Sequence, residues 1–171
     1  MPNTFTKIAS VTVGGAGAAS MAFTSIPSTY TDLVIKVSAR DIGARKRGVL
    51  VVNFNGSSAN LTYRRLYGVV AFGSPGSDSG SDGTTSYIDG NTATANTFSN
   101  DEIYIPNYAN SNFKSFSTDG VSESNDNDPG ASLTANLWSS TAAITSITLT
   151  TTVPDNFLQY STATLYGIKS S

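Results

Sequence analysis

The chain has 171 residues, a length that suits a single domain with one core. Ten lysines and arginines against twelve acids give a formal net charge of −2 and a pI near 4.8, which argues against a protein that works by neutralising nucleic-acid phosphate. Histidine and cysteine are both absent, which excludes Ser-His-Asp triads, Cys-His pairs, disulfides and zinc sites built on imidazole or thiolate.

Alternation of apolar and polar residues predicts an all-β chain with little or no helix. In chain order, short strands are predicted at residues 5–13, 21–26, 32–40, 49–54, 61–67, 97–105, 113–118, 132–138, 145–153 and 159–168. Such a series favours one antiparallel β-sandwich domain over residues 1–171, jelly-roll-like, although another Greek-key sandwich fits equally well. The sequence offers neither a secretory leader nor an apolar run that would cross a membrane.

The strand at 32–40 has the clearest alternation. Leu33, Ile35, Val37 and Ala39 fall on one face, and Lys36, Ser38 and Arg40 fall on the other. We therefore predict one buried side and one solvated side, with Arg40 on the solvated side.

Arg45, Lys46 and Arg47 form the one basic cluster, in a short connection between two predicted strands. Two interpretations remain open. The cluster is either a charged tip that prevents edge-to-edge aggregation or a docking site for an acidic protein partner. Arg64 and Arg65 do not extend it, because neighbouring residues of a strand point to opposite faces.

Two polar segments, 73–85 and 119–130, are predicted to be long surface loops. The second contains Asn125, Asp126, Asn127 and Asp128, whose oxygens are of the type that calcium binds. The spacing does not match an EF-hand, so a solvated acidic loop without metal is the main prediction for 126–128.

Most aromatic residues are predicted to pack in the core. Phe98, Tyr104, Phe113 and Phe116 lie in predicted strands, and Trp138 is placed at a strand end, where it would cap the core. Tyr63 and Tyr67 share one face of their strand and are candidates either for glycan contact or for a protein interface.

Enzymatic activity is not expected. Without histidine and cysteine, the remaining design is a pair of carboxylates, for which Glu102 with Glu123 or Asp101 is the available choice. Most acids stand in polar turns, where carboxylates are solvated and ordinary, so no catalytic residue, cofactor or metal is assigned.

Several phrases together resemble a known group of proteins. They are FTSIPSTYTDLVIKVSAR at 23–40, TATANTFSNDEIYIPNY at 92–108, LWSSTAAITSITLT at 137–150 and LQYSTATLYGIK at 158–169. Over residues 5–169 the chain is similar to small virion-associated structural proteins of tailed bacteriophages, a group often described as tail-fibre-like. The resemblance implies a virion component, and it transfers no catalytic residue.

Two functions are therefore expected from the resemblance. The first is a capsid decoration or cement protein that stabilises the shell through protein–protein contacts, as a homo-oligomer with a trimer favoured. The second is a receptor-binding module of a tail or head fibre that recognises host-surface glycans. Either protein would be assembled into the virion in the host cytoplasm, with capsid or tail proteins as partners and with neither nucleic acid nor membrane.

Overall fold

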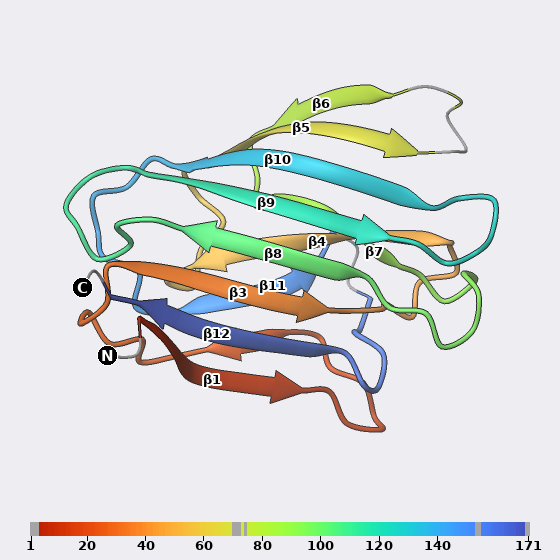
Figure 1. The fold of residues 1–171 in the computed structure, drawn as a ribbon, viewed down its shortest axis with the longest axis horizontal. Helices are drawn as coiled ribbons and strands as arrows, with labels where there is room; N and C mark the ends of the chain where they lie inside the picture. The colour runs from red at the N-terminus through yellow and green to blue at the C-terminus, as the bar shows by residue number, and fades with distance from the viewer. Residues whose placement is uncertain (1–3, 70–72, 74, 153–154, 170–171) are drawn as a thin grey trace.

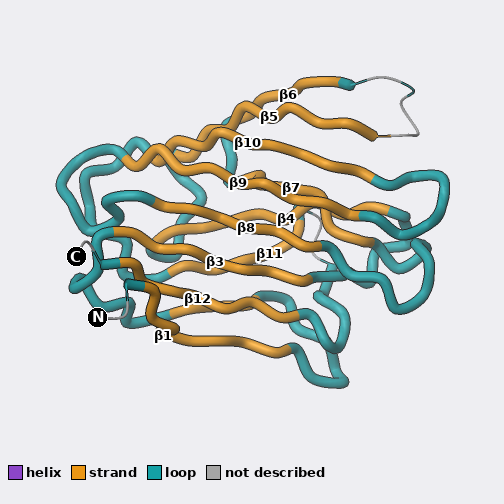
Figure 2. Tube along the Cα trace, in the orientation of Figure 1, coloured by secondary structure: helices purple, strands orange, loops and turns teal. Residues whose placement is uncertain are grey.

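The computed structural model describes residues 4–69, 73, 75–152 and 155–169, and these residues form two antiparallel sheets and no helix (Figures 1 and 2). The large sheet has eight strands in the order β1-β12-β3-β8-β9-β10-β5-β6, and the small sheet has four in the order β2-β11-β4-β7. The prediction of an all-β sandwich is thus confirmed. Jelly-roll connectivity stays a prediction.

The strands have the following bounds. The large sheet contains β1 (Phe5–Thr12), β3 (Asp32–Ser38), β5 (Leu61–Val69), β6 (Gly76–Gly80), β8 (Asn100–Ile105), β9 (Lys114–Ser122), β10 (Gly130–Trp138) and β12 (Thr162–Ile168). The small sheet contains β2 (Met21–Phe23), β4 (Arg47–Phe54), β7 (Thr84–Asp89) and β11 (Ile147–Thr151).

The apolar core lies between the small sheet and the half of the large sheet that contains β3, β8 and β12. Leu33, Ile35 and Val37 of β3 are buried there, as the alternation predicted. They belong to one cluster with the inward residues of β2, β4, β8, β11 and β12. Trp138 caps this core at the end of β10, where its ring lies 5.4 Å from that of Phe54.

The other half of the sandwich has a polar interior, where β9 and β10 pack on β7. All six residues of β7 are buried, although the strand reads TTSYID. Asn136 donates from Nδ2 to the carbonyl of Thr84 at 2.8 Å, and the Thr134 hydroxyl donates to the carbonyl of Thr85. Buried polar side chains are stable where they find such partners, so β7 and β10 are held together by hydrogen bonds.

Both predicted long loops are shorter than expected. Segment 73–85 contains β6 and the first residues of β7, and 119–130 contains the end of β9 and the start of β10, which leaves residues 123–129 as the connection. Strand β6 (GSDSG) has no apolar residue, and it is an edge strand that pairs only with β5. Its glycines are covered by rings from β5, so the strand needs no side chains of its own there.

Arg40 is the main exception to the predicted facing of residues 32–40. The expected solvated side chain is 3% exposed. The loop that follows β7 folds over it, and the guanidinium donates to the carbonyls of Asn91, Ala93, Thr94 and Thr97. Backbone carbonyls therefore take the place of water around this charge.

The four predicted core aromatics differ in their burial. Phe116 is buried, whereas Phe98 and Tyr104 are half-buried and Phe113 is exposed. The prediction was therefore wrong for Phe113, which directly precedes β9 and lies on the exposed side of its alternation, opposite to Phe116.

Candidate functional site

Strand β10 turns its apolar side chains outward. Its exposed residues are Ala131, Leu133, Ala135 and Leu137, and its buried ones are Ser132, Thr134, Asn136 and Trp138. In the neighbouring strands, Leu66 of β5 and Val121 of β9 are also exposed. We call the outward side of Leu66, Val121, Ala131, Leu133, Ala135 and Leu137 the β10 face.

The register of the sheet gathers this face into one patch. Leu133 lies opposite Leu66 on β5, and Ala131 lies opposite Val121 on β9. Directly opposed side chains on one face of a sheet have Cβ atoms about 5 Å apart, so the two leucines form a continuous ridge. Leu66 is 62% exposed and Leu133 is 57% exposed, which leaves most of that ridge in contact with water.

A hollow lies on each side of the ridge, and Leu66 and Leu133 line both. One hollow, of about 500 Å³, extends over Ala135 toward β6. The other, of about 540 Å³, extends over Gly68, Ala131 and Val121. Small residues contribute to the lining of both hollows, with Ser77, Ser79 and Ala135 in the first and Gly68, Gly120 and Ala131 in the second.

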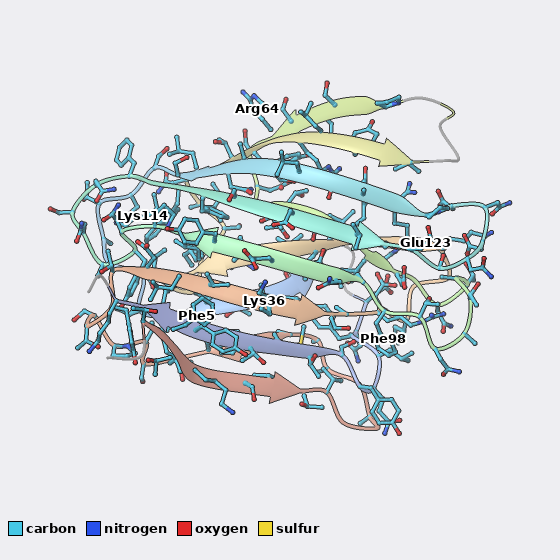
Figure 3. All side chains as sticks on the ribbon, viewed as in Figure 1. Phe5, Lys36, Arg64, Phe98, Lys114 and Glu123 are labelled. Carbon is cyan, nitrogen blue, oxygen red and sulfur yellow. The ribbon has the colours of Figure 1, made fainter. Side chains whose placement is uncertain are left out.

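Charges of both signs border the β10 face. Arg64 is exposed on β5 beside Ala135, and its guanidinium donates to the carbonyl of Tyr63 at 2.8 Å. Asp119 is exposed on β9 beside Leu133. Figure 3 labels Arg64 above β5 and β10. Protein-docking surfaces commonly have an apolar centre and a polar or charged border.

Comparison of the chain with protein-family models, curated proteins and solved structures finds no match. No helix in the part of the chain that the structure describes is long and apolar enough to cross a membrane.

The basic cluster is paired within the protein. Arg45, Lys46 and Arg47 each lie within 4 Å of at least one carboxylate oxygen. The partners, in that order, are Asp41 together with Asp155, then Asp126, then Asp128. The pairs of Lys46 and Arg47 join the start of β4 to the connection after β9, and the Arg45–Asp155 pair reaches the connection between β11 and β12. Docking of an acidic partner on this cluster stays a prediction, and such a partner would compete with these acids.

The carboxylates of the candidate calcium loop at 126–128 take part in these ion pairs. Asp128 accepts from Arg47 at 2.5 Å, and Asp126 accepts from the backbone N–H of Asp128 at 2.7 Å. Among the described residues no three acidic side chains come together to hold a metal ion. Asp126 and Asp128 pair with Lys46 and Arg47.

Tyr63 and Tyr67 lie half-buried on the inward face of β5, on either side of Arg65. Glycines stand opposite them in β6: a Cβ at Gly80 would approach the Tyr63 ring to 2.6 Å, and one at Gly76 would approach the Tyr67 ring to 2.8 Å. The guanidinium carbon of Arg65 lies 5.7 Å from each ring centroid. Both rings therefore cover glycine and arginine, and their predicted interface or glycan role is still untested.

The acids considered for carboxylate chemistry do not converge. Glu102 points to the outer face of β8, where it pairs with Lys36, and Glu123 is exposed in the connection after β9. Asp101, the neighbour of Glu102, is buried on the inner side. The three carboxylates therefore lie in three different environments.

Asp101 is a buried acid that sequence reasoning did not assign to the interior. Ser99 donates to its Oδ2 at 2.7 Å, and a Cβ at Gly120 would lie 2.3 Å from its Oδ1. Burial raises the pKa of Asp101 to about 7, because the ionised form loses its hydration, and the nearby charge of Asp89 acts in the same direction.

The raised pKa of Asp101 predicts a pH-dependent stability. The folded protein keeps this proton up to about pH 7, whereas the unfolded chain releases it above its ordinary value of 3.8, so the contribution of Asp101 to stability falls as pH rises between these values. We expect Asp101→Asn to be more stable than the wild type at pH 8 by more than about 1 kcal/mol and to lose this advantage at pH 4. Urea unfolding of both proteins at the two pH values checks this, and an equal difference at both would contradict it.

Proposed function

We propose that this protein is a structural component of a bacteriophage virion, a decoration or cement protein that attaches to the capsid shell through its β10 face. The observation that carries the proposal is the outward-facing apolar side of β10. A solvated sheet face ordinarily carries polar residues, and a contiguous exposed apolar patch marks a surface that another protein covers. The resemblance of segments 23–40, 92–108, 137–150 and 158–169 to virion proteins of tailed phages supports the viral setting.

The energetics of the face favour a protein partner. Complete burial of a leucine or valine side chain contributes about 1.5–3 kcal/mol, and Leu66, Leu133 and Val121 all stand exposed together. Covering them against an apolar patch of the shell therefore supplies several kilocalories per mole before any polar contact forms. Nucleic acid would need a basic surface, whereas Arg64 and Asp119 offset each other at this border.

The remaining parts of the proposal follow from this role. The protein acts without catalysis or cofactor, as a homo-oligomer with a trimer favoured, and it joins the virion in the host cytoplasm. In the alternative function, a receptor-binding module of a tail or head fibre, the same domain would recognise host-surface glycans, and far fewer copies would be present per particle.

The test measures copy number and the role of Leu133 together. Particles of a phage that lacks the chain are mixed with purified wild type or with Leu133→Asp, and the bound protein is quantified by mass spectrometry after sedimentation. We expect hundreds of wild-type copies per particle. We expect binding about a hundredfold weaker for the variant, because it places a charge at the centre of an apolar contact.

Phe5→Asp is the matched control, since Phe5 is a comparably exposed apolar residue on β1, at the opposite part of the same sheet. It is expected to bind like the wild type. A dozen or a few dozen copies per particle would favour the fibre module over decoration. Normal binding by Leu133→Asp would show that the shell contact lies elsewhere.

A further inference from the structure

A small pocket lies at the end of the sandwich where β3 finishes and β8 and β12 begin, away from the β10 face. Its volume is about 280 Å³, and its lining includes Gly15, Arg40, Asn96, Phe98, Gln159 and Tyr160. Figure 3 labels Phe98 in this region, beyond the ends of β3 and β8, on the opposite side of the molecule from Arg64. The lining thus combines two aromatic rings, two side-chain amides and one buried arginine.

Tyr160 is held in the pocket by a backbone conformation that tyrosine disfavours. It is the third residue of a turn closed by a hydrogen bond from the N–H of Ser161 to the carbonyl of Leu158, and its φ is 73°. Glycine or asparagine is the usual residue at such a position. The side chain is 68% exposed and has no ring partner among the described residues. Packing therefore gives no reason for a strained tyrosine here, whereas functional sites often retain such residues.

A second turn of the same kind presents Asn96 to the pocket. Its hydrogen bond runs from the N–H of Thr97 to the carbonyl of Thr94, and Asn96 is again the third residue, with a φ of 65°. Phe98 follows two residues later and is half-buried. The side-chain amide of Asn96 makes no hydrogen bond within the described part of the chain, so it remains available to a ligand.

Arg40 forms hydrogen bonds with both turns. Its guanidinium donates to the carbonyls of Thr94 at 2.7 Å and Thr97 at 3.0 Å, and its own carbonyl accepts from the N–H of Leu158 at 2.7 Å. Its Nε is buried and has no hydrogen-bond partner in the described residues. Arg40 thus holds the Asn96 turn through its side chain and the Tyr160 turn through its backbone carbonyl before any ligand arrives. Such preorganisation lowers the cost of binding.

The chemistry of the lining fits a neutral, hydroxyl-rich ring. Tyrosine and phenylalanine offer flat apolar surfaces with a polar handle at one end, and amides both donate and accept hydrogen bonds. No carboxylate lines the described pocket, so nothing there would attract a cationic ligand, and the arginine charge is already surrounded by carbonyls. The volume is close to the lower end for ligand pockets, which suits a single sugar ring.

We propose that this pocket binds one neutral hexose or N-acetylhexosamine unit of a glycan, with the sugar stacked on Tyr160 and Phe98 and its hydroxyls hydrogen-bonded to Asn96 and Gln159. The site is independent of the β10 face. A virion protein with both surfaces would hold the shell on one side and adhere to carbohydrate on the other.

The test uses the full chain and defined sugars. Methyl glycosides of glucose, galactose, mannose and N-acetylglucosamine are titrated to millimolar concentrations into ¹⁵N-labelled protein, and amide shifts in the two turns are followed by NMR. We expect at least one sugar to shift the amides around Asn96 and Tyr160 in a saturable manner. Absence of saturable shifts with all four sugars overturns the proposal.

Tyr160→Gly separates binding from folding. Glycine adopts a φ of 73° without strain, so this variant is expected to unfold at the same temperature as the wild type or higher. It should bind the sugar at least about tenfold more weakly, because the stacking surface is gone. Tyr160→Phe, which keeps the ring, should retain most of the affinity. Undiminished sugar binding by Tyr160→Gly would overturn the assignment.

Two further variants distinguish this site from the shell contact. Leu133→Asp is expected to bind sugar normally even if it fails to bind particles. Tyr160→Gly is expected to bind particles normally. If Tyr160→Gly instead lost particle binding while the wild type bound no sugar, the pocket would belong to the protein interface and not to a glycan.

Discussion

Arg40→Met is expected to destabilise the protein by about 3–5 kcal/mol and to release the loop between β7 and β8. The guanidinium donates to four backbone carbonyls of residues 91–97 and to the hydroxyl of Thr97. Methionine fills a similar volume but donates no hydrogen bond, so these acceptors lose their partners inside a segment that has folded around them.

Urea denaturation gives the loss of stability, and hydrogen exchange of the amides in residues 90–99 shows whether this loop opens first. Arg64→Met is the matched control, since Arg64 is exposed and donates only to the carbonyl of Tyr63. The control should change stability by less than about 0.5 kcal/mol. A loss below about 1 kcal/mol for Arg40→Met would mean that the loop is held by other contacts.

Gly83→Ala is expected to cost about 3 kcal/mol or more, or to prevent folding. A Cβ at this position would lie 1.9 Å from the carbonyl oxygen of Val52, far inside contact distance. That oxygen belongs to the backbone of β4, and the N–H of Val52 donates to the carbonyl of Gly83 at 2.8 Å. The added methyl group must therefore push the backbone at the start of β7 away from β4, because no side chain separates the two backbones there.

Gly14→Ala provides the control for this prediction. A Cβ at Gly14 meets nothing within 4 Å, and its φ is not in the left-handed region. Alanine there is expected to be neutral or to stabilise by roughly 0.4–1 kcal/mol, because it restricts the unfolded chain. Thermal unfolding of both variants compares them directly. If they had similar melting temperatures, the close approach of Gly83 to Val52 would not be rigid.

Sequence alternation located most of the strands, and the reason is visible in β3. Leu33, Ile35 and Val37 repeat with period two and enter one apolar core, so local pattern and tertiary environment agree. Fold class was therefore predictable, since burial of alternating apolar residues drives it.

Strands β6 and β7 were missed because their environment is polar. GSDSG has no apolar residue, and its place in the sheet depends on the rings of Tyr63 and Tyr67, which come from another strand. In TTSYID, Thr84 and Thr85 are buried against β10 by hydrogen bonds, and of its six residues only Ile88 belongs to the apolar core cluster. The spacing of apolar residues along the sequence indicates neither the tyrosine rings over β6 nor the hydrogen bonds from β10.

The alternation of apolar and polar residues by itself determined the all-β class, because it depends only on the period of the sequence. The composition by itself excluded histidine and cysteine chemistry, because neither residue is present. Which face of each strand is covered was decided by the tertiary structure. The polar edge strand β7 of the small sheet packs on the side of β10 that carries Ser132, Thr134 and Asn136, so Leu133 faces outward. The loop that folds over Arg40 buries this arginine, which then lines a pocket. Both outcomes depend on partners that are distant in sequence, so no local window contains them.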